Sequence, residues 1–215
     1  MNRHTRTSSV CRTWILAAAV ALMGLSTSAV AAPSAQPAAA PVSNESPQAF
    51  VERMHKQLDG LVAKHKQLAG LHDAIGTQFV DRFDFLYMGQ RVLGDKTWKG
   101  LKDAQRDEFL ELLEKMLRRT YVKRFKPGHK VHVSYAKVRK GKEGRVQVRT
   151  KIKVKRTRAD VWYSLRPSEN GWRIFDIVVD EASQLRTYRR SFRKALKKDG
   201  WEGLIARMKK SASRG

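Results

Sequence analysis

The stretch VQVRTKIKVKRTRADVWYSLRPSENGWRIFDIVV, residues 146–179, alternates apolar and polar side chains over much of its length. A period of two residues is typical of strands in a sheet with one buried and one wet face. Short links separate its apolar runs, among them the turn from Pro167 to Gly171. Strands joined by such short links pair antiparallel. With a further alternating run at 131–135, the pattern predicts an antiparallel meander of about four strands.

Helical periodicity surrounds this sheet in the sequence. Apolar residues recur every three to four positions over three upstream ranges, 47–71, 71–88 and 103–125. Two further helices are predicted downstream, at 183–196 and 201–208. Helices, then a curled antiparallel sheet, then helices define an α+β fold.

The first 31 residues have the three parts of a secretory signal peptide. Arg3, Arg6 and Arg12 supply positive charge, the run 14–25 is apolar, and Ala29-Val30-Ala31 is the small-residue pattern that signal peptidases accept. A membrane anchor is the alternative, but the apolar run is short for a bilayer span. We therefore predict a signal peptide over residues 1–31 and export to the periplasm.

The predicted leader that follows, residues 32–47, is rich in Ala, Pro, Ser and Gln, which favours disorder. Residues 48–215 then form one domain. Cys11, the only cysteine, precedes the apolar run and is lost with the signal peptide, so the mature protein is expected to have no disulfide.

Positive charge dominates the composition. The formal net charge is +24, and removal of residues 1–31 takes away three Arg and no acid, leaving +21. Strand alternation places one group of cations opposite the apolar face: Arg145, Arg149, Lys151, Lys153 and Lys155. A solvated surface is one interpretation, and steering toward anionic membrane surfaces is another. Binding to nucleic acid is not expected, because export removes the protein from it and no recognition motif is present.

No catalytic constellation is found in the sequence. It contains no nucleophile elbow, no phosphate-binding glycine loop and no paired-histidine zinc motif. The histidines that follow the predicted signal peptide are scattered, so neither a metal site nor a cofactor is predicted. We do not expect an enzyme.

From about Phe50 onward, the chain resembles the MlaC-like family, also called the toluene-tolerance or Mla lipid-asymmetry family. The resemblance covers some three-quarters of the chain and rests on the order and spacing of many short pieces. These pieces are Phe83-Asp84-Phe85, Val92-Leu93-Gly94, Trp98, Ala104-Gln105-Arg106, Phe109, Thr120-Tyr121, Trp162-Tyr163-Ser164-Leu165, Gly171-Trp172-Arg173-Ile174-Phe175-Asp176-Ile177, Ser183, Tyr188-Arg189, Phe192, Gly200 and Gly203-Leu204-Ile205.

The resemblance implies a cystatin- or NTF2-like fold whose apolar cavity holds phospholipid acyl chains. It also implies shuttling between an outer-membrane lipoprotein–porin complex and an inner-membrane ABC transporter that carries an MCE-domain ring. One branch of the family is associated with hopanoid, a polycyclic lipid. The chain departs from the family pattern at Asp180-Glu181-Ala182-Ser183, where a glycine is expected after the acid. The missing glycine is expected to alter the hinge between sheet and helix.

The apolar stripes supply candidate walls for such a cavity. The predicted lipid-binding residues are Phe83, Leu86, Tyr87, Leu113, Met116, Leu117, Tyr121, Val133, Val148, Ile152, Tyr163 and Trp172. Periodicity alone does not distinguish a lined cavity from a filled core. A periplasmic adaptor or chaperone with a solid core, binding acidic partners through its basic strands, therefore remains the alternative.

The mature protein is expected to begin near Ala32 and to fractionate with the periplasm, because signal peptidase cleaves after small residues. Intact-mass measurement of the protein purified from a periplasmic extract checks this. An uncleaved chain in the membrane pellet would show that residues 1–31 act as an anchor.

Overall fold

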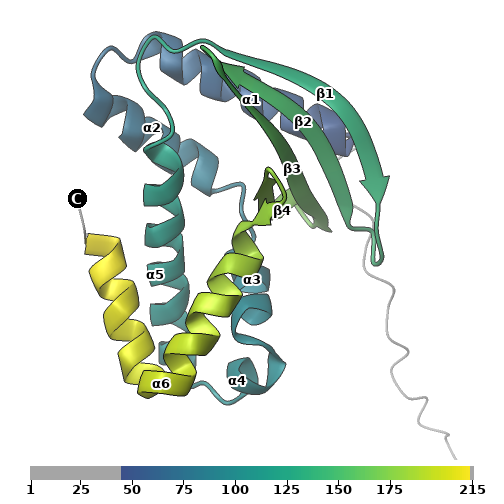
Figure 1. Ribbon diagram of the computed structural model, residues 1–215. Coiled ribbons are helices and arrows are strands. Elements are labelled where there is room, and N and C mark those ends of the chain that lie inside the picture. Colours follow the sequence, from purple (N-terminus) through teal and green to yellow (C-terminus); the bar gives the residue numbers. More distant parts are fainter. Residues whose placement is uncertain (1–44, 214–215) are drawn as a thin grey trace, which may run out of the picture. The chain divides into compact units, whose positions relative to one another are not determined.

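The computed structural model describes residues 45–213, and this range is coloured in Figure 1. The predicted signal peptide and most of the predicted leader lie outside it. Glu45 to Pro47, which the sequence assigned to the leader, belong to the described domain: Ser46 caps the first helix and Pro47 begins it. No helix within 45–213 is both long and apolar enough to cross a membrane.

One antiparallel sheet organises the domain. Its strands are β1 (Val131–Lys140), β2 (Val146–Val154), β3 (Thr157–Ser168), β4 (Gly171–Val179) and the short β5 (Ala182–Ser183), and they pair in chain order. Figure 1 shows the first strands curling together over α1 (Pro47–Lys64). The predicted α+β meander is confirmed, with β5 as an additional strand paired with the end of β4.

The predicted helix over 71–88 is wrong, because the chain leaves the helical conformation at 81–84. The structure has α2 (Leu68–Val80) and then α3 (Phe85–Leu93). Between them, Asp84 N donates to Ile174 O and Ile174 N donates to Arg82 O, both at 2.8 Å. Asp84 then caps α3 by accepting a hydrogen bond from Tyr87 N at 2.9 Å. Pairing with β4 thus replaces one helical turn, a tertiary contact that periodicity does not contain.

The remaining helices pack together at the other end of the domain. They are α4 (Asp95–Lys99), α5 (Asp103–Val122) and α6 (Gln184–Ser213), and α6 contacts both α3 and α5. Phe109, Leu113 and Leu117 of α5 are completely buried there. Gly200 interrupts α6 with a non-helical φ of 65° and ψ of −165°. The break agrees with the two C-terminal helices predicted from the sequence.

The corner between β4 and α6 contains the departure from the family pattern. Asp180 and Glu181 both have left-handed backbones, with φ of 45° and 68°. The left-handed region is costly for residues with a Cβ and free of that cost for glycine. Buried Asp176 holds the corner, accepting hydrogen bonds from Ser183 Oγ at 2.6 Å and Leu185 N at 2.9 Å. Two consecutive residues with a Cβ therefore adopt left-handed backbones at this corner, at a cost in backbone strain.

Replacing Glu181 with glycine is expected to raise the free energy of unfolding by about 0.5–1 kcal/mol, since the Cβ penalty disappears. Urea unfolding followed by circular dichroism measures this. Glu169→Gly is the matched control, because Glu169 is also an exposed turn acid but has no left-handed φ. A Glu181→Gly protein no more stable than the parent would show that the turn is unstrained.

Candidate functional site

A cavity of about 490 Å³ lies between α1 and the inner face of the sheet. The end of α5 and the loop that follows it form one of its sides. Its walls are mainly apolar, with Leu58 and Val62 from α1, Phe79 from α2 and Phe125 from the loop. The sheet contributes Val131, Ile152, Val154, Ala159, Val161, Ile177 and Val179.

The cavity exists because the helices cover only part of the inner face. At one end of β2, Val146 and Val148 are buried, with 7% and 1% of their surface exposed. On the same face farther along, Ile152 and Val154 are only half-buried. Ala159 and Val179, on neighbouring strands, are also half-buried. Partly exposed apolar side chains that line a concavity are typical of ligand pockets.

A hydrogen-bonded triad supplies one polar part of the wall, through His55 and Tyr163, while its third member lies outside the lining. His55 of α1 is buried, with Nδ1 2.9 Å from the Tyr135 hydroxyl and Nε2 2.9 Å from the Tyr163 hydroxyl. A neutral imidazole donates from one nitrogen and accepts at the other, so either tautomer satisfies both contacts. Desolvation lowers the pKa of His55 to about 4. Burial also raises the pKa of Tyr135 to about 12. The triad therefore stays uncharged at neutral pH and adds no net charge to the cavity.

Tyr121 supplies a second polar group. Its ring packs in an aromatic cluster with Phe79 and Phe83, with centroids 5.5 and 5.7 Å away. The hydroxyl is buried and has no hydrogen-bond partner among residues 45–213. Desolvation raises the pKa of this hydroxyl, so it remains a neutral donor. An unpaired buried hydroxyl costs about 1–3 kcal/mol.

The rim of the cavity is basic. Arg124, Lys126 and Lys155 line it together with one acid, Asp59. Arg124 and Lys126 follow α5, whereas Lys155 lies in the tight turn between β2 and β3 with a φ of 55°. All four side chains are exposed. The opening thus combines an apolar interior with a positive edge.

Three of the predicted wall residues, Tyr121, Ile152 and Tyr163, line this cavity. Phe83 and Val148 lie behind the wall: Phe83 packs against Tyr121, and Val148 pairs with Tyr163. Val133 pairs with Ile152 at the margin without lining the cavity.

The other predicted wall residues lie elsewhere. Leu113 and Leu117 belong to the filled helical core, and half-buried Met116 packs against it. Leu86 is 55% exposed. The Tyr87 hydroxyl accepts a hydrogen bond from Arg145 at 2.9 Å, and Trp172 lies in a different, polar pocket.

Sequence reasoning missed most of the wall, including His55, Val161, Ile177 and Val179. Leu58, Val62 and Phe79 were part of the predicted helical stripes, and the strand valines were part of the predicted inner face. The sequence therefore predicted that these residues are buried, but it did not predict that they lie beside an uncovered part of the sheet. His55 had no signal beyond its place among apolar neighbours.

The predicted basic group is divided among several environments. Lys151 and Lys153 are exposed on the outer sheet face. Arg149 pairs with Asp160, while Arg145 contacts Glu143 as well as Tyr87. Lys155 is at the cavity rim. Within the described range there is no group of His, Cys, Asp and Glu side chains that could hold a metal ion.

These features define an α+β domain over residues 45–213 with an apolar cavity between a helix and a sheet. The sequence matches the family described as MlaC protein over residues 48–210, and the chain belongs to that family. A solved structure of a phospholipid-binding protein from Ralstonia solanacearum, in complex with a phospholipid, is similar with a TM-score of 0.70 and 20% identity. The match covers 79% of this chain and 98% of that chain. A comparison with curated proteins gave no match.

The buried imidazole predicts a pH dependence of stability. The pKa of His55 is lower in the folded protein than its usual 6.5, so its contribution is complete above that value and is lost as the pH falls toward about 4. Over that interval the parent is expected to lose about 3 kcal/mol more unfolding free energy than His55→Gln. Urea titrations of both proteins across the pH range measure the difference. Parallel curves would mean that folding leaves the pKa of His55 at its ordinary value, as for a solvated imidazole.

Proposed function

We propose that this protein is a periplasmic lipid carrier, which binds phospholipid acyl chains in the cavity between α1 and the sheet. The observation that carries the proposal is an apolar cavity of about 490 Å³ lined by half-buried side chains of the inner sheet face. Membership of the MlaC family supports it. The phospholipid bound to the structurally similar Ralstonia protein also supports it.

The cavity suits the physical problem of moving a lipid through water. Burying each methylene group contributes about 0.8 kcal/mol, so a long acyl chain exposed to water costs many times the thermal energy. A volume of about 490 Å³ falls within the size range of ordinary ligand pockets. Non-directional apolar contacts with the valines, Leu58 and Phe79 suit tails of various lengths. No covalent step is needed.

The positions of the polar groups favour one orientation of the bound lipid in the cavity. The basic rim of Arg124, Lys126 and Lys155 suits a phosphate at the mouth, and the apolar walls suit the tails inside. The neutral His55 triad avoids placing a charge beside the tails.

The carrier exchanges lipid with membrane complexes in this proposal. A binding protein alone only equilibrates its ligand, so direction comes from its partners. Those partners are the outer-membrane lipoprotein–porin complex and the inner-membrane MCE-domain ABC transporter. The signal peptide proposed for residues 1–31 delivers the protein to the periplasm between them. Exposed Lys151 and Lys153 on the outer sheet face favour transient encounter with anionic membrane surfaces.

Filling the cavity is expected to displace lipid without unfolding the protein. Ala159 is half-buried in the wall, so Ala159→Trp places a large apolar side chain where a tail would lie. Native mass spectrometry of protein purified from cells is expected to show lipid on the parent and at least about tenfold less on the variant.

Ala136→Trp is the matched control, because Ala136 is exposed on β1 and outside the cavity. Circular dichroism confirms that both variants fold. A parent protein without lipid-sized mass would contradict the carrier and favour the adaptor. A bound mass that corresponds to a hopanoid would support the carrier function but with a different lipid.

A further inference from the structure

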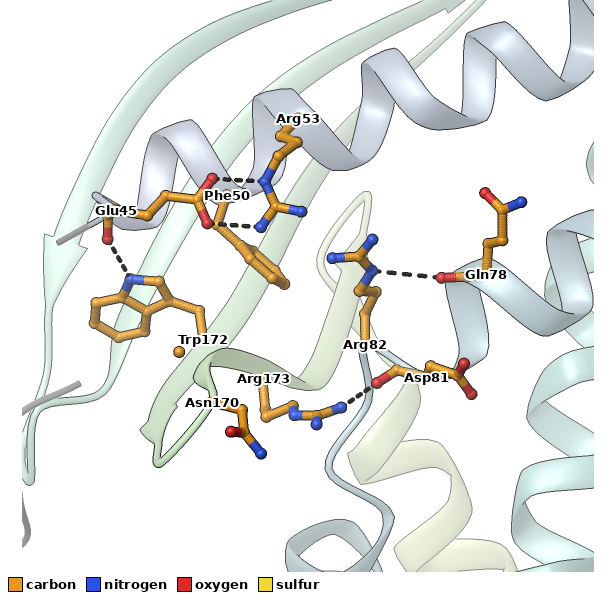
Figure 2. A pocket seen from close by; sticks show the side chains of 10 residues that line it. Glu45, Phe50, Arg53, Gln78, Asp81, Arg82, Asn170, Trp172 and Arg173 are labelled. Carbon is orange, nitrogen blue, oxygen red and sulfur yellow. Dashed lines mark hydrogen bonds and ion pairs between the residues drawn. The ribbon is translucent and has the colours of Figure 1, made fainter. Parts of the chain in front are cut away.

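A second pocket, of about 520 Å³, lies at the beginning of α1 and is separate from the cavity. Three guanidinium groups surround it: Arg53 of α1, Arg82 of the 81–84 segment and Arg173 of β4. Figure 2 shows these side chains around one opening, with the Phe50 ring between them. We call this site the arginine groove. None of its lining residues lines the apolar cavity.

Backbone pairing fixes the groove. Arg82 O accepts a hydrogen bond from Ile174 N at 2.8 Å, which ties the 81–84 segment to β4 beside Arg173. Arg173 Nη1 donates to Asp81 O across the same junction (Figure 2). Arg82 Nη2 also donates to Gln57 Oε1 at 2.7 Å. These contacts position two cations side by side before any ligand arrives.

Two acids, Glu45 and Asp81, also line the groove, but in the described part of the chain only one of the three arginines forms an ion pair. Glu45 forms a two-pronged contact with Arg53, at 2.8 Å to Nε and 2.7 Å to Nη2. Arg82 and Arg173 instead donate to neutral amide and carbonyl oxygens, and neither forms an ion pair within residues 45–213. Burial first, and then the positive charges of Arg53 and Arg173, lower the pKa of Arg82, although the nearby carboxylates of Glu45 and Asp81 act in the opposite direction. An added anion would relieve this repulsion.

Glu45 shows what kind of anion the groove accepts. Its carboxylate binds Arg53, while its backbone carbonyl accepts a hydrogen bond from Trp172 Nε1 at 2.8 Å (Figure 2). The next residue, Ser46, has an extended backbone with φ of −67° and ψ of 153°. The groove therefore holds an acidic residue through both its side chain and its main chain. Arg82 and Arg173 remain as places for further carboxylates.

We propose that the arginine groove is a docking site for an acidic, extended peptide segment of a partner protein, and that Glu45 occupies part of it as an internal competitor. The planar guanidinium group of arginine matches a carboxylate in geometry. The indole N–H of Trp172 donates to a backbone carbonyl, a group that a peptide has and a small anion lacks. Removing the Glu45 charge frees Arg53 and lets the segment engage all three cations.

Fluorescence anisotropy with a fluorescein-labelled hexaglutamate peptide tests the proposal on the full mature protein. The double variant Arg82→Gln/Arg173→Gln is expected to bind about tenfold more weakly than the parent. Glu45→Gln is expected to bind severalfold more tightly, a gain that misfolding cannot produce. The matched control is Lys151→Gln/Lys153→Gln, which removes the same charge from the outer sheet face.

Equal weakening by the control pair would overturn the proposal, because attraction would then come from net charge alone. So would unchanged or weaker binding by Glu45→Gln. Competition by inorganic phosphate at concentrations similar to those of unlabelled hexaglutamate would assign the groove to small anions instead. Retained lipid, counted in parallel, is expected to be the same in every variant. The peptide-docking proposal and the lipid-carrier proposal are therefore tested independently.

Discussion

The structure depends on a mismatch between an apolar sheet face and the helices available to cover it. Along β2, the same face is closed at Val146 and Val148 and open at Ile152 and Val154. A fully covered face would form an ordinary core, whereas a fully bare one would favour aggregation. Because α1 and the end of α5 stop short of closing the face, an apolar space remains with a single basic rim. The proposed lipid carrier follows from that space.

Polar groups inside this space are arranged to stay neutral. His55 bridges two tyrosine hydroxyls, and desolvation keeps its pKa near 4. The Tyr121 hydroxyl remains without a partner in the described range. Neutral groups in the wall avoid the repulsion of acyl chains that a buried charge would cause. The positive charges are kept at the rim, where water still reaches them.

Strand β4 connects the two candidate sites. Its beginning supplies Trp172 and Arg173 to the arginine groove, and its end supplies Ile177 and Val179 to the cavity. Between them, Ile174 is completely buried and holds the 81–84 segment by two backbone hydrogen bonds. A partner docked at the groove would therefore contact the same strand that lines the ligand cavity.

The sequence by itself determined the α+β class, the antiparallel meander and the inner-face parity of residues such as Val148, Ile152 and Tyr163, because side-chain period follows local backbone geometry. It also indicated the break at Gly200. Only the tertiary structure decided that 81–84 leaves the helix, since that segment gains backbone partners from β4, about ninety residues later. Likewise, only packing decided that Ile152 lines a cavity while Leu113 fills a core. Both residues are apolar and follow the expected periodicity. A cavity, however, forms only where neighbouring helices and strands do not pack against each other, and that depends on the tertiary structure.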